Sequence, residues 1–394
     1  MDAALRRRRM SLFVLFFVPG MMFASWVTRT PDVRDLLEAS TATMGLVLFG
    51  LSVGSMLGIL SSGALTARFG TRPVITVGIS LQLLATPTIG AGAAIGSAWL
   101  TAIGLGLMGL GMGGAEVAMN VEGAEVEQRA GVPVLPALHG SFSLGTVAGA
   151  VIGLGAVALH LPVLWHLLMV TVIAVLAVLW ALPGVPRSQA SGPVEKSHHA
   201  PVWRDRRLLI IGVIVLALAL AEGSANDWLP LLMVDGHGFD PAWSSGLFAV
   251  FAAMMTIGRF SGGPLITRFG RAAVLGGSAA LGAVGLALVI FADSPVVAAC
   301  AIPLWGLGAA LGFPVAISAA GDSGPNSAAR VSLVATIGYV AFLAGPPALG
   351  FLGEHFGLRL AMILVLVLVA LAVTLTPALR GIGAAETEDA ARQP

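Results

Sequence analysis

The chain has 394 residues, of which 57% are hydrophobic and only 10% are charged. Soluble domains carry about 25% charged residues, so this chain has too few charges to cover a water-exposed surface. The formal net charge of +1 gives no electrostatic reason to expect a nucleic-acid partner. The single cysteine, Cys300, excludes an internal disulfide framework and a multi-cysteine metal site. The composition therefore predicts a polytopic membrane protein.

Twelve continuous apolar runs are long enough to cross a bilayer, which takes about 20 helical residues. Their approximate bounds are 11–28, 41–64, 73–95, 98–119, 137–159, 162–182, 207–227, 242–264, 271–292, 295–318, 330–352 and 357–378. The runs do not alternate as the strands of a β-barrel would. The first run follows the arginines 6–9, but no clean cleavage site closes it, so we interpret it as a retained helix. We expect an all-α membrane protein with twelve transmembrane helices.

Basic residues predict the orientation of these helices. If the N-terminus lies in the cytoplasm, only Arg29, Arg34 and Arg359, among 21 Lys and Arg, fall on the outer side. This bias follows the rule that basic residues collect in cytoplasmic loops. We therefore expect a multi-pass protein of the inner membrane with both termini in the cytoplasm.

The sequence divides into two similar halves. A polar segment, 183–206, predicts a cytoplasmic linker between a six-helix bundle over 1–182 and a second over 207–394, which ends in a short cytoplasmic tail. The string GALTARFG, beginning at Gly63, recurs as GPLITRFG at Gly263. Two duplicated six-helix halves with a substrate site between them are a known transporter plan.

Twelve spans, a central linker and a repeated G-x-L-x-x-R-F-G turn resemble the major facilitator superfamily. The strings EVAMNVEGAEVE, LHGSFSLGTVAG, AEGSANDWLP and GPPALGFLGEHFGLR are further similar to the YbjJ-like inner-membrane group related to the fucose permeases. Ala67 and Thr267 stand where the loop signature of the superfamily has an aspartate. The resemblance implies two pseudo-symmetric six-helix bundles and a conformational role for the turn residues, which are Gly63, Arg68, Gly70, Arg72 and Arg268.

Charged side chains inside a span cost about 2.5–3.5 kcal/mol on insertion scales, so each needs a partner, a water-filled cavity or a function. Glu222 lies past the middle of the seventh span, and Asn226 and Asp227 follow about one turn later. Four residues apart, Glu222 and Asn226 share one helix face. One interpretation makes Glu222 the first candidate for proton coupling, with Asn226 and Asp227 as substrate contacts. The alternative is a carboxylate bound to backbone at a broken helix end, with its two neighbours capping the span.

The fourth span repeats this spacing with Glu116 and Asn120. The resemblance implies that spans one, four, seven and ten line the transport cavity. Glu116 is then the second candidate for proton coupling, and Asn120 is a candidate substrate contact. The alternative is a cytoplasmic charge network with Arg68, Arg129 or His139 that stabilises a closed state.

Five more residues are candidates for conformational roles. His139 opens the fifth span, either as a proton relay or as a satisfied polar residue. Asp322 and Arg330 flank the turn between spans ten and eleven, where a latch between the halves is favoured over substrate contact. Pro346 and Pro347 are expected to kink the eleventh span and give one half a bending point.

Two further residues are candidate ligand contacts. Trp305 lies near the middle of the tenth span, far from the membrane interfaces where tryptophan collects, so it is either a stacking platform for a ring-shaped ligand or a core residue. Arg29 follows the first span on the outer side, where it is either an anion hook or an interfacial anchor.

The sequence shows no nucleophile motif, metal-ligand cluster or nucleotide-binding loop, so we expect no enzyme, no metal and no cofactor. The expected function is secondary active transport of a small polar solute, such as a sugar or sugar derivative. Proton coupling is expected because a carboxylate at low dielectric binds a proton more readily. We expect a monomer in the lipid bilayer. Efflux of amphipathic compounds is the alternative, and a non-transporting membrane sensor or scaffold is a weaker one.

Overall fold

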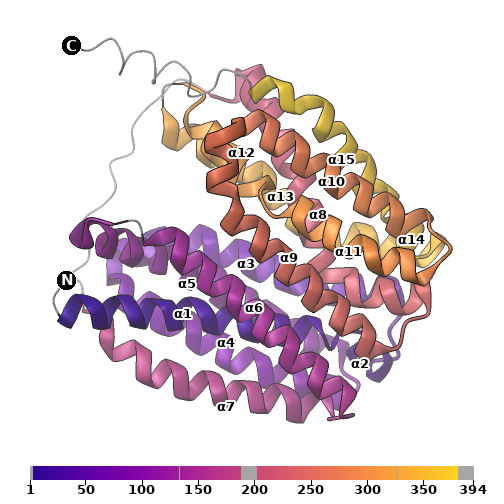
Figure 1. Ribbon diagram of the computed structural model, residues 1–394. Coiled ribbons are helices and arrows are strands. Elements are labelled where there is room, and N and C mark those ends of the chain that lie inside the picture. The colour runs from indigo at the N-terminus through magenta and orange to yellow at the C-terminus, as the bar shows by residue number, and fades with distance from the viewer. Residues whose placement is uncertain (1–2, 133, 188–201, 325, 380–394) are drawn as a thin grey trace. The chain divides into compact units, whose positions relative to one another are not determined.

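A computed structural model describes residues 3–132, 134–187, 202–324 and 326–379 (Figure 1). Over these ranges the chain is helical and has no strand. Twelve helical stretches in the described part are long and apolar enough to cross a membrane, which confirms the predicted spans. The central part of the predicted linker, 188–201, lies outside the described residues.

The described helices follow the apolar runs closely. Before the linker they are α1 (Ala3–Val27), α2 (Thr30–Leu36), α3 (Thr41–Phe69), α4 (Thr71–Ala94), α5 (Ala98–Ala130), α6 (Leu135–Ala158), α7 (Val163–Ala181) and the short η1 (Leu182–Gly184). After it they are η2 (Val202–Arg204), α8 (Arg206–His237), α9 (Pro241–Phe269), α10 (Arg271–Phe291), α11 (Pro295–Ala309), α12 (Gly312–Gly321), α13 (Ser327–Phe356), α14 (Leu358–Ala361), α15 (Ile363–Leu375) and η3 (Thr376–Leu379).

The repeated turn has the same backbone in both halves. Gly70 joins α3 to α4 at a φ of 81°, and Gly270 joins α9 to α10 at a φ of 79°. A side chain at this φ meets its own backbone, so glycine is the residue that permits the turn. The duplication read from the sequence is therefore also a duplication of local structure.

Packing divides the chain into two compact units. Unit 1 comprises 1–195, 229–253 and 346–355, and unit 2 comprises 196–228, 254–345 and 356–394. The division differs from the predicted halves, 1–182 and 207–394, because unit 1 also takes in parts of α8, α9 and α13. The halves describe a repeat in the sequence, whereas the units describe which segments pack together.

Three polar contacts join those added segments to the rest of unit 1. Arg34 of α2 forms an ion pair with Asp235 of α8. The Ser245 hydroxyl of α9 donates to the Thr28 carbonyl oxygen at 3.0 Å. The Ala42 backbone N–H of α3 donates to a Glu354 carboxylate oxygen of α13 at 3.1 Å. All three lie near α2, so we call this the α2 end of unit 1.

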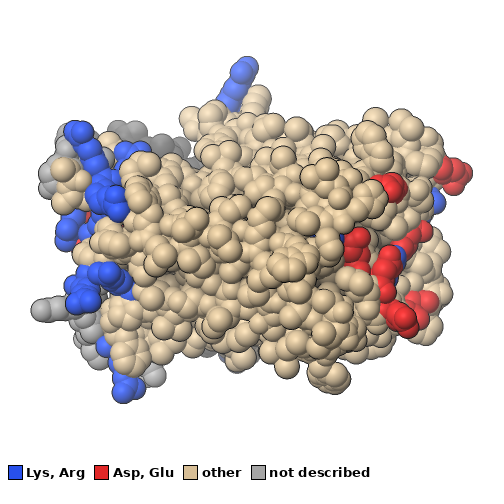
Figure 2. Space-filling model, turned by 90° about the horizontal axis from the view of Figure 1, so that it is seen from below, with Lys and Arg blue, Asp and Glu red and all other residues tan. Residues whose placement is uncertain are grey.

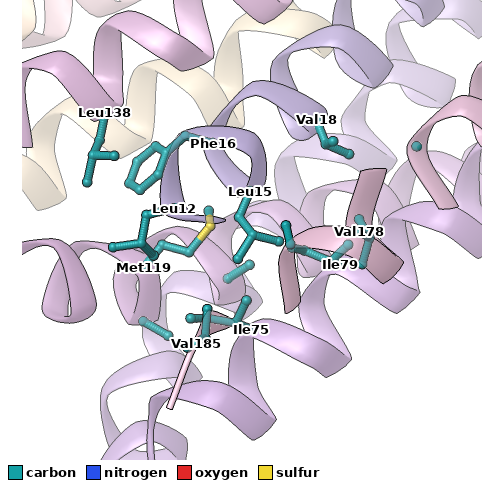
Figure 3. Packing of buried hydrophobic residues seen from close by; sticks show 14 of the residues in the cluster. Leu12, Leu15, Phe16, Val18, Ile75, Ile79, Met119, Leu138, Val178 and Val185 are labelled. Carbon is teal, nitrogen blue, oxygen red and sulfur yellow. The ribbon is translucent and has the colours of Figure 1, made fainter. Parts of the chain in front are cut away.

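The core of unit 1 is built where α1 packs against its neighbours. Buried side chains of α1 meet others from α4, α5, α6 and α7, among them Leu12, Leu15, Phe16, Ile75, Ile79, Met119, Leu138 and Val178 (Figure 3). Small residues let α1 and α6 approach backbone to backbone, since a Cβ added at Gly145 would overlap the Phe17 carbonyl oxygen. Close approach at glycine is the usual way for helices to associate in lipid.

Residues other than Lys, Arg, Asp and Glu cover most of the face seen in Figure 2. Large apolar side chains such as Leu60, Leu84 and Val172 are exposed along the helices. Exposed apolar side chains along helices of this length match spans that lie in hydrocarbon.

Candidate transport site

An ion pair joins two membrane-spanning helices of unit 2 within their spans. Glu222 of α8 accepts a hydrogen bond at 2.8 Å from the guanidinium of Arg259 of α9, and their side chains are 13% and 28% exposed. Glu222 lies 16 residues from the start of α8, which is about 24 Å along the helix axis. The pair brings two opposite charges to the depth where charge is most costly.

Sequence reasoning identified Glu222 but missed Arg259. Arg259 lies ten residues before the end of α9, within a span, so the rule that selected Glu222 applied equally to it. The orientation rule instead groups it with the basic residues of the cytoplasmic side. Its partner could not be read from the sequence, because the two residues are 37 positions apart.

Trp305 supports the backbone beside this pair. Its indole N–H donates to the carbonyl oxygen of Ala221, the residue before Glu222, at 3.1 Å. The side chain is fully buried. Both observations favour the core-packing alternative over a stacking platform, because a fully buried ring presents no open face.

Asn226 and Asp227 continue along α8 and are both partly exposed. Asn226 lies one turn beyond Glu222 on the same face of the helix. Neither residue has a hydrogen-bond or ion-pair partner among the described residues. Asp227 therefore differs from Glu222, which has an ion-pair partner in Arg259.

Arg29 is buried in unit 1, where it holds α2 against the start of α7. One guanidinium nitrogen donates to the Leu161 carbonyl oxygen at 2.7 Å, and another lies 2.9 Å from a carboxylate oxygen of Asp32. Burial lowers the pKa of Arg29 and raises the pKa of Asp32. This geometry favours the anchor interpretation of Arg29 over the anion hook.

A charge network lies at the opposite end of unit 1, where α1 begins. Glu122 of α5 is fully buried, accepts from Arg8 of α1 at 2.9 Å and also accepts from the Thr71 hydroxyl of α4. Glu125 bonds to both Arg8 and Arg129. The sequence predicted a network at this end with Glu116 as its carboxylate, which stays a prediction, and it missed Glu122.

The other predicted residues of this end are placed as follows. Glu116 is exposed on α5, and the buried amide oxygen of Asn120 has no hydrogen-bond partner among the described residues. His139 is exposed and packs edge-on against the ring of Phe16, with ring centres 5.4 Å apart. Arg68 is exposed and lies over the ring of the adjacent Phe69.

The remaining turn residues have few neighbours. Arg268 repeats the geometry of the first turn over Phe269, and Arg72 lies in the first turn of α4. Gly63 has open space around it, since an added Cβ would meet no atom within 4 Å. Their conformational roles stay predictions.

Asp322 and Arg330 both pair inside unit 2. Arg271 of α10 bonds to Asp322, and Arg330 of α13 bonds to Asp205, which precedes α8. The bond to Arg330 is the main cause that lowers the pKa of Asp205. The latch between halves stays a prediction, and within unit 2 these pairs tie neighbouring helix ends together.

Pro346 and Pro347 lie inside the 30-residue helix α13. Unit 2 ends at Gly345 and unit 1 resumes at Pro346, so the prolines stand where this helix passes from one unit to the other. A proline removes a backbone hydrogen bond and weakens the helix locally. The position is consistent with the predicted bending point, which stays a prediction.

Twelve apolar helices, a structural repeat and a charge pair at mid-span define the chain as a membrane transporter in class. A sequence model described as the Major Facilitator Superfamily matches residues 11–335. The chain is 31% identical over 358 residues to an uncharacterized MFS-type transporter of Yersinia pestis, covering 90% of this chain and 91% of that one. The chain therefore belongs to the Major Facilitator Superfamily, and it is a secondary transporter for small molecules and not an enzyme.

Solved structures share the fold at low sequence identity. The nucleoside transporter NupG superimposes with a TM-score of 0.70 at 15% identity, covering 95% of this chain and 98% of that chain. The E. coli fucose:proton symporter FucP superimposes with a TM-score of 0.62 at 18% identity, covering 94% and 98%. These likenesses confirm the predicted fold and carry no conclusion about the solute.

Proposed function

We propose that this chain moves a small polar solute, such as a sugar or sugar derivative, by alternating access coupled to protons. The observation that carries the proposal is the Glu222–Arg259 pair, which lies within the spans of α8 and α9. Ionisable residues at this depth are expensive and belong to solute or proton pathways in membrane proteins. Superfamily membership supplies the transport plan into which this pair fits.

The residues divide by role within this proposal. Glu222 is the first candidate for proton coupling and Glu116 the second, while Asn226, Asp227 and Asn120 are candidate solute contacts. Two buried residues, Trp305 and Arg29, act by holding the backbone of α8 and α2 in place.

The orientation follows from the distribution of basic residues. We propose that both termini lie in the cytoplasm of a cell with an inner membrane, and that the α2 end of unit 1 faces outward. Arginines 6–9 at the start of α1 support this, because basic residues collect on the cytoplasmic side. We propose that the protein works as a monomer.

Two observations favour a polar solute. Two solved proteins with this fold are named a fucose:proton symporter and a nucleoside transporter, and both names refer to polar solutes. The pair of opposite charges in α8 and α9 also suits a polar ligand better than an apolar one.

The test is thermal stabilisation of the purified protein by a panel of sugars, nucleosides, organic acids and lipophilic cations, each at two pH values. A ligand that binds the folded state raises its Tm by mass action. We expect a small polar solute to raise the Tm in a pH-dependent way, and Glu222→Gln to remove both effects. Glu38→Gln is the matched control, because Glu38 is exposed and outside the spans.

Other outcomes decide against the proposal. Broad, pH-insensitive stabilisation by lipophilic cations would identify an efflux protein for amphipathic compounds. A Glu222→Gln protein that binds its solute with unchanged pH dependence would remove Glu222 from the coupling mechanism.

A further inference from the structure

Asp227 is a carboxylate without a counter-charge at the depth of the membrane. It lies in α8, five residues after Glu222 and ten residues, about 15 Å, before the helix ends at His237. The side chain is partly exposed, and it has no hydrogen-bond or ion-pair partner among the described residues. Such a group is costly to keep ionised unless a positive charge reaches it.

Glu222 is in the opposite situation. Its carboxylate forms an ion pair with the guanidinium of Arg259 at 2.8 Å. The bond from Trp305 to the Ala221 carbonyl oxygen fixes the backbone that presents Glu222 to Arg259. The charge of Glu222 is therefore already neutralised within the protein.

The helices packed against α8 in unit 2 leave Asp227 unmatched. Contacts to α8 come from α9 through Arg259, from α11 through Trp305, from α12 at Gly312 and from α13 at Gly338. The sequences of α11 and α12 contain no Asp, Glu, Lys, Arg or His. The only charge that α9 brings to mid-span is Arg259, which Glu222 holds.

Titratable groups of α13 lie elsewhere or are engaged. Arg330, near its start, pairs with Asp205, and Tyr339 packs against the ring of Phe313. Glu354 and His355, near its end, belong to unit 1. Across the described helices that contact α8 in unit 2, the balance at mid-span is one ion pair plus one unmatched negative charge.

We propose that Asp227 is a second site of this segment, separate from the Glu222–Arg259 pair, that takes up and returns a single positive charge during transport. The charge is either a proton, which adds to one carboxylate oxygen and leaves a neutral acid, or the ammonium group of a solute, which donates hydrogen bonds and breaks no covalent bond. The place of this step in a cycle rests on the proposed transport function, whereas the binding of the charge does not.

Infrared spectroscopy of the purified protein tests the proton arm, because the carbonyl stretch of a protonated carboxylic acid is separate from that of a carboxylate. Spectra are compared from about pH 6 to about pH 9, above the ordinary titration range of exposed carboxylates. We expect a carbonyl band in this range that disappears in Asp227→Asn and persists in Glu222→Gln. Asp227→Glu is the folding control. It keeps a carboxyl group at this position and should therefore retain the band at a shifted frequency.

Glucosamine tests the ammonium arm, with glucose as the neutral control of the same size. If an ammonium group occupies the site, glucosamine but not glucose will bind, and Asp227→Asn will weaken its affinity at least about tenfold. If the site is reserved for a proton, the carbonyl band will be unaffected by glucosamine. Either result supports the proposal and identifies the source of the charge.

The proposal is overturned if the band is absent or survives in Asp227→Asn and glucosamine affinity is also unchanged by that variant. A band lost only in Glu222→Gln would instead assign the proton to Glu222. Because infrared spectra need no solute flux, a band at Asp227 without any stabilising solute would leave this assignment standing and contradict the transport proposal.

Discussion

Arg8 and Glu122, 114 residues apart, form a buried ion pair that joins α1 to α5. The hydroxyl of Thr71, from α4, donates to the second carboxylate oxygen of Glu122. Ala67, four residues before Thr71, replaces the aspartate of the superfamily's loop signature. The charge network at this end of unit 1 is thus centred on α5 and not on the loop.

Removing one partner of this pair should destabilise the protein strongly. Glu122→Gln leaves Arg8 buried without its main counter-charge, which costs about 3–5 kcal/mol for a buried pair. The measurement is denaturant unfolding in detergent. Glu125→Gln is the control, because the Glu125 side chain is 37% exposed and pairs near the surface are worth about 0–1 kcal/mol.

The double variant Arg8→Leu with Glu122→Leu removes both charges, and so shows how much of the lost stability comes from leaving Arg8 buried without a partner. An apolar replacement of both charges should recover most of the loss, because the pair costs desolvation energy to form. If Glu122→Gln unfolds at the same denaturant concentration as Glu125→Gln, the buried pair contributes no special stability.

Gly145 and Gly155, both in α6, should respond in opposite directions to alanine. A Cβ at Gly145 would overlap the Phe17 carbonyl oxygen of α1, whereas a Cβ at Gly155 would meet no atom within 4 Å. We expect Gly145→Ala to lower the free energy of unfolding by about 1–3 kcal/mol through overpacking. Gly155→Ala should be neutral or stabilising by up to about 1 kcal/mol, because alanine favours helix. Equal effects of the two in unfolding experiments would contradict the close α1–α6 approach.

The stability contribution of Asp205 should depend on pH. Asp205 bonds to Arg330 and accepts from the backbone N–H groups of Arg207 at 2.9 Å and Leu208 at 3.2 Å, at the start of α8. Because the pKa of Asp205 is lowered in the folded state, its stabilisation is present above the ordinary pKa and is lost as pH falls through the folded value.

Asp205→Asn isolates the charge, since asparagine caps a helix about as well as aspartate. We expect it to lower stability by about 1 kcal/mol at neutral pH, a modest value because the Asp205 side chain is 35% exposed. The difference from wild type should close below about pH 4. The measurement is thermal unfolding from neutral to acid pH, with Asp293→Asn, the same substitution at an exposed site, as the control.

Continuous apolar runs made the twelve spans predictable, because each run alone satisfies the length of a bilayer. The repeated turn was predictable for a similar reason, since the positive φ that requires glycine at positions 70 and 270 is a local property of the backbone. Pairing was not predictable, because the partner of a charge depends on which helices meet. In the sequence, Arg8 is one of four consecutive arginines before the first apolar run. Nothing there indicates its bond to Glu122, 114 positions away.

The same limit explains the candidate site. Depth in the membrane identified Glu222 and Trp305, since position along an apolar run is a property of the sequence. Whether each is paired, buried or open depends on neighbours from other helices. The bond from Trp305 to Ala221, 84 residues away, is the kind of contact that no local pattern reports.

Gly45 and Gly350 should control access at the α2 end of unit 1. A Cβ at Gly45 would lie 2.9 Å from the Pro346 carbonyl oxygen, and one at Gly350 would lie 2.8 Å from the Cα of Gly45. The start of α3 and the end of α13 therefore touch with no room for a side chain. Under alternating access this contact must separate in the opposite state, so a large residue at Gly45 should favour the separated state.

Labelling with a maleimide measures that separation at a cysteine placed at Ala42, in a Cys300→Ser background that removes the native thiol. Ala42 donates to Glu354 across the same contact, so its exposure reports whether α3 and α13 have parted. Gly45→Leu should raise the labelling rate about fivefold or more, because overpacking of about 1–3 kcal/mol shifts a two-state balance by at least that factor. Gly155→Leu makes the same substitution in α6 at a site with open space, and should leave the rate unchanged. Equal rates in folded Gly45→Leu and Gly155→Leu proteins would mean that this contact does not open, and the moving interface of the transporter would have to be sought elsewhere.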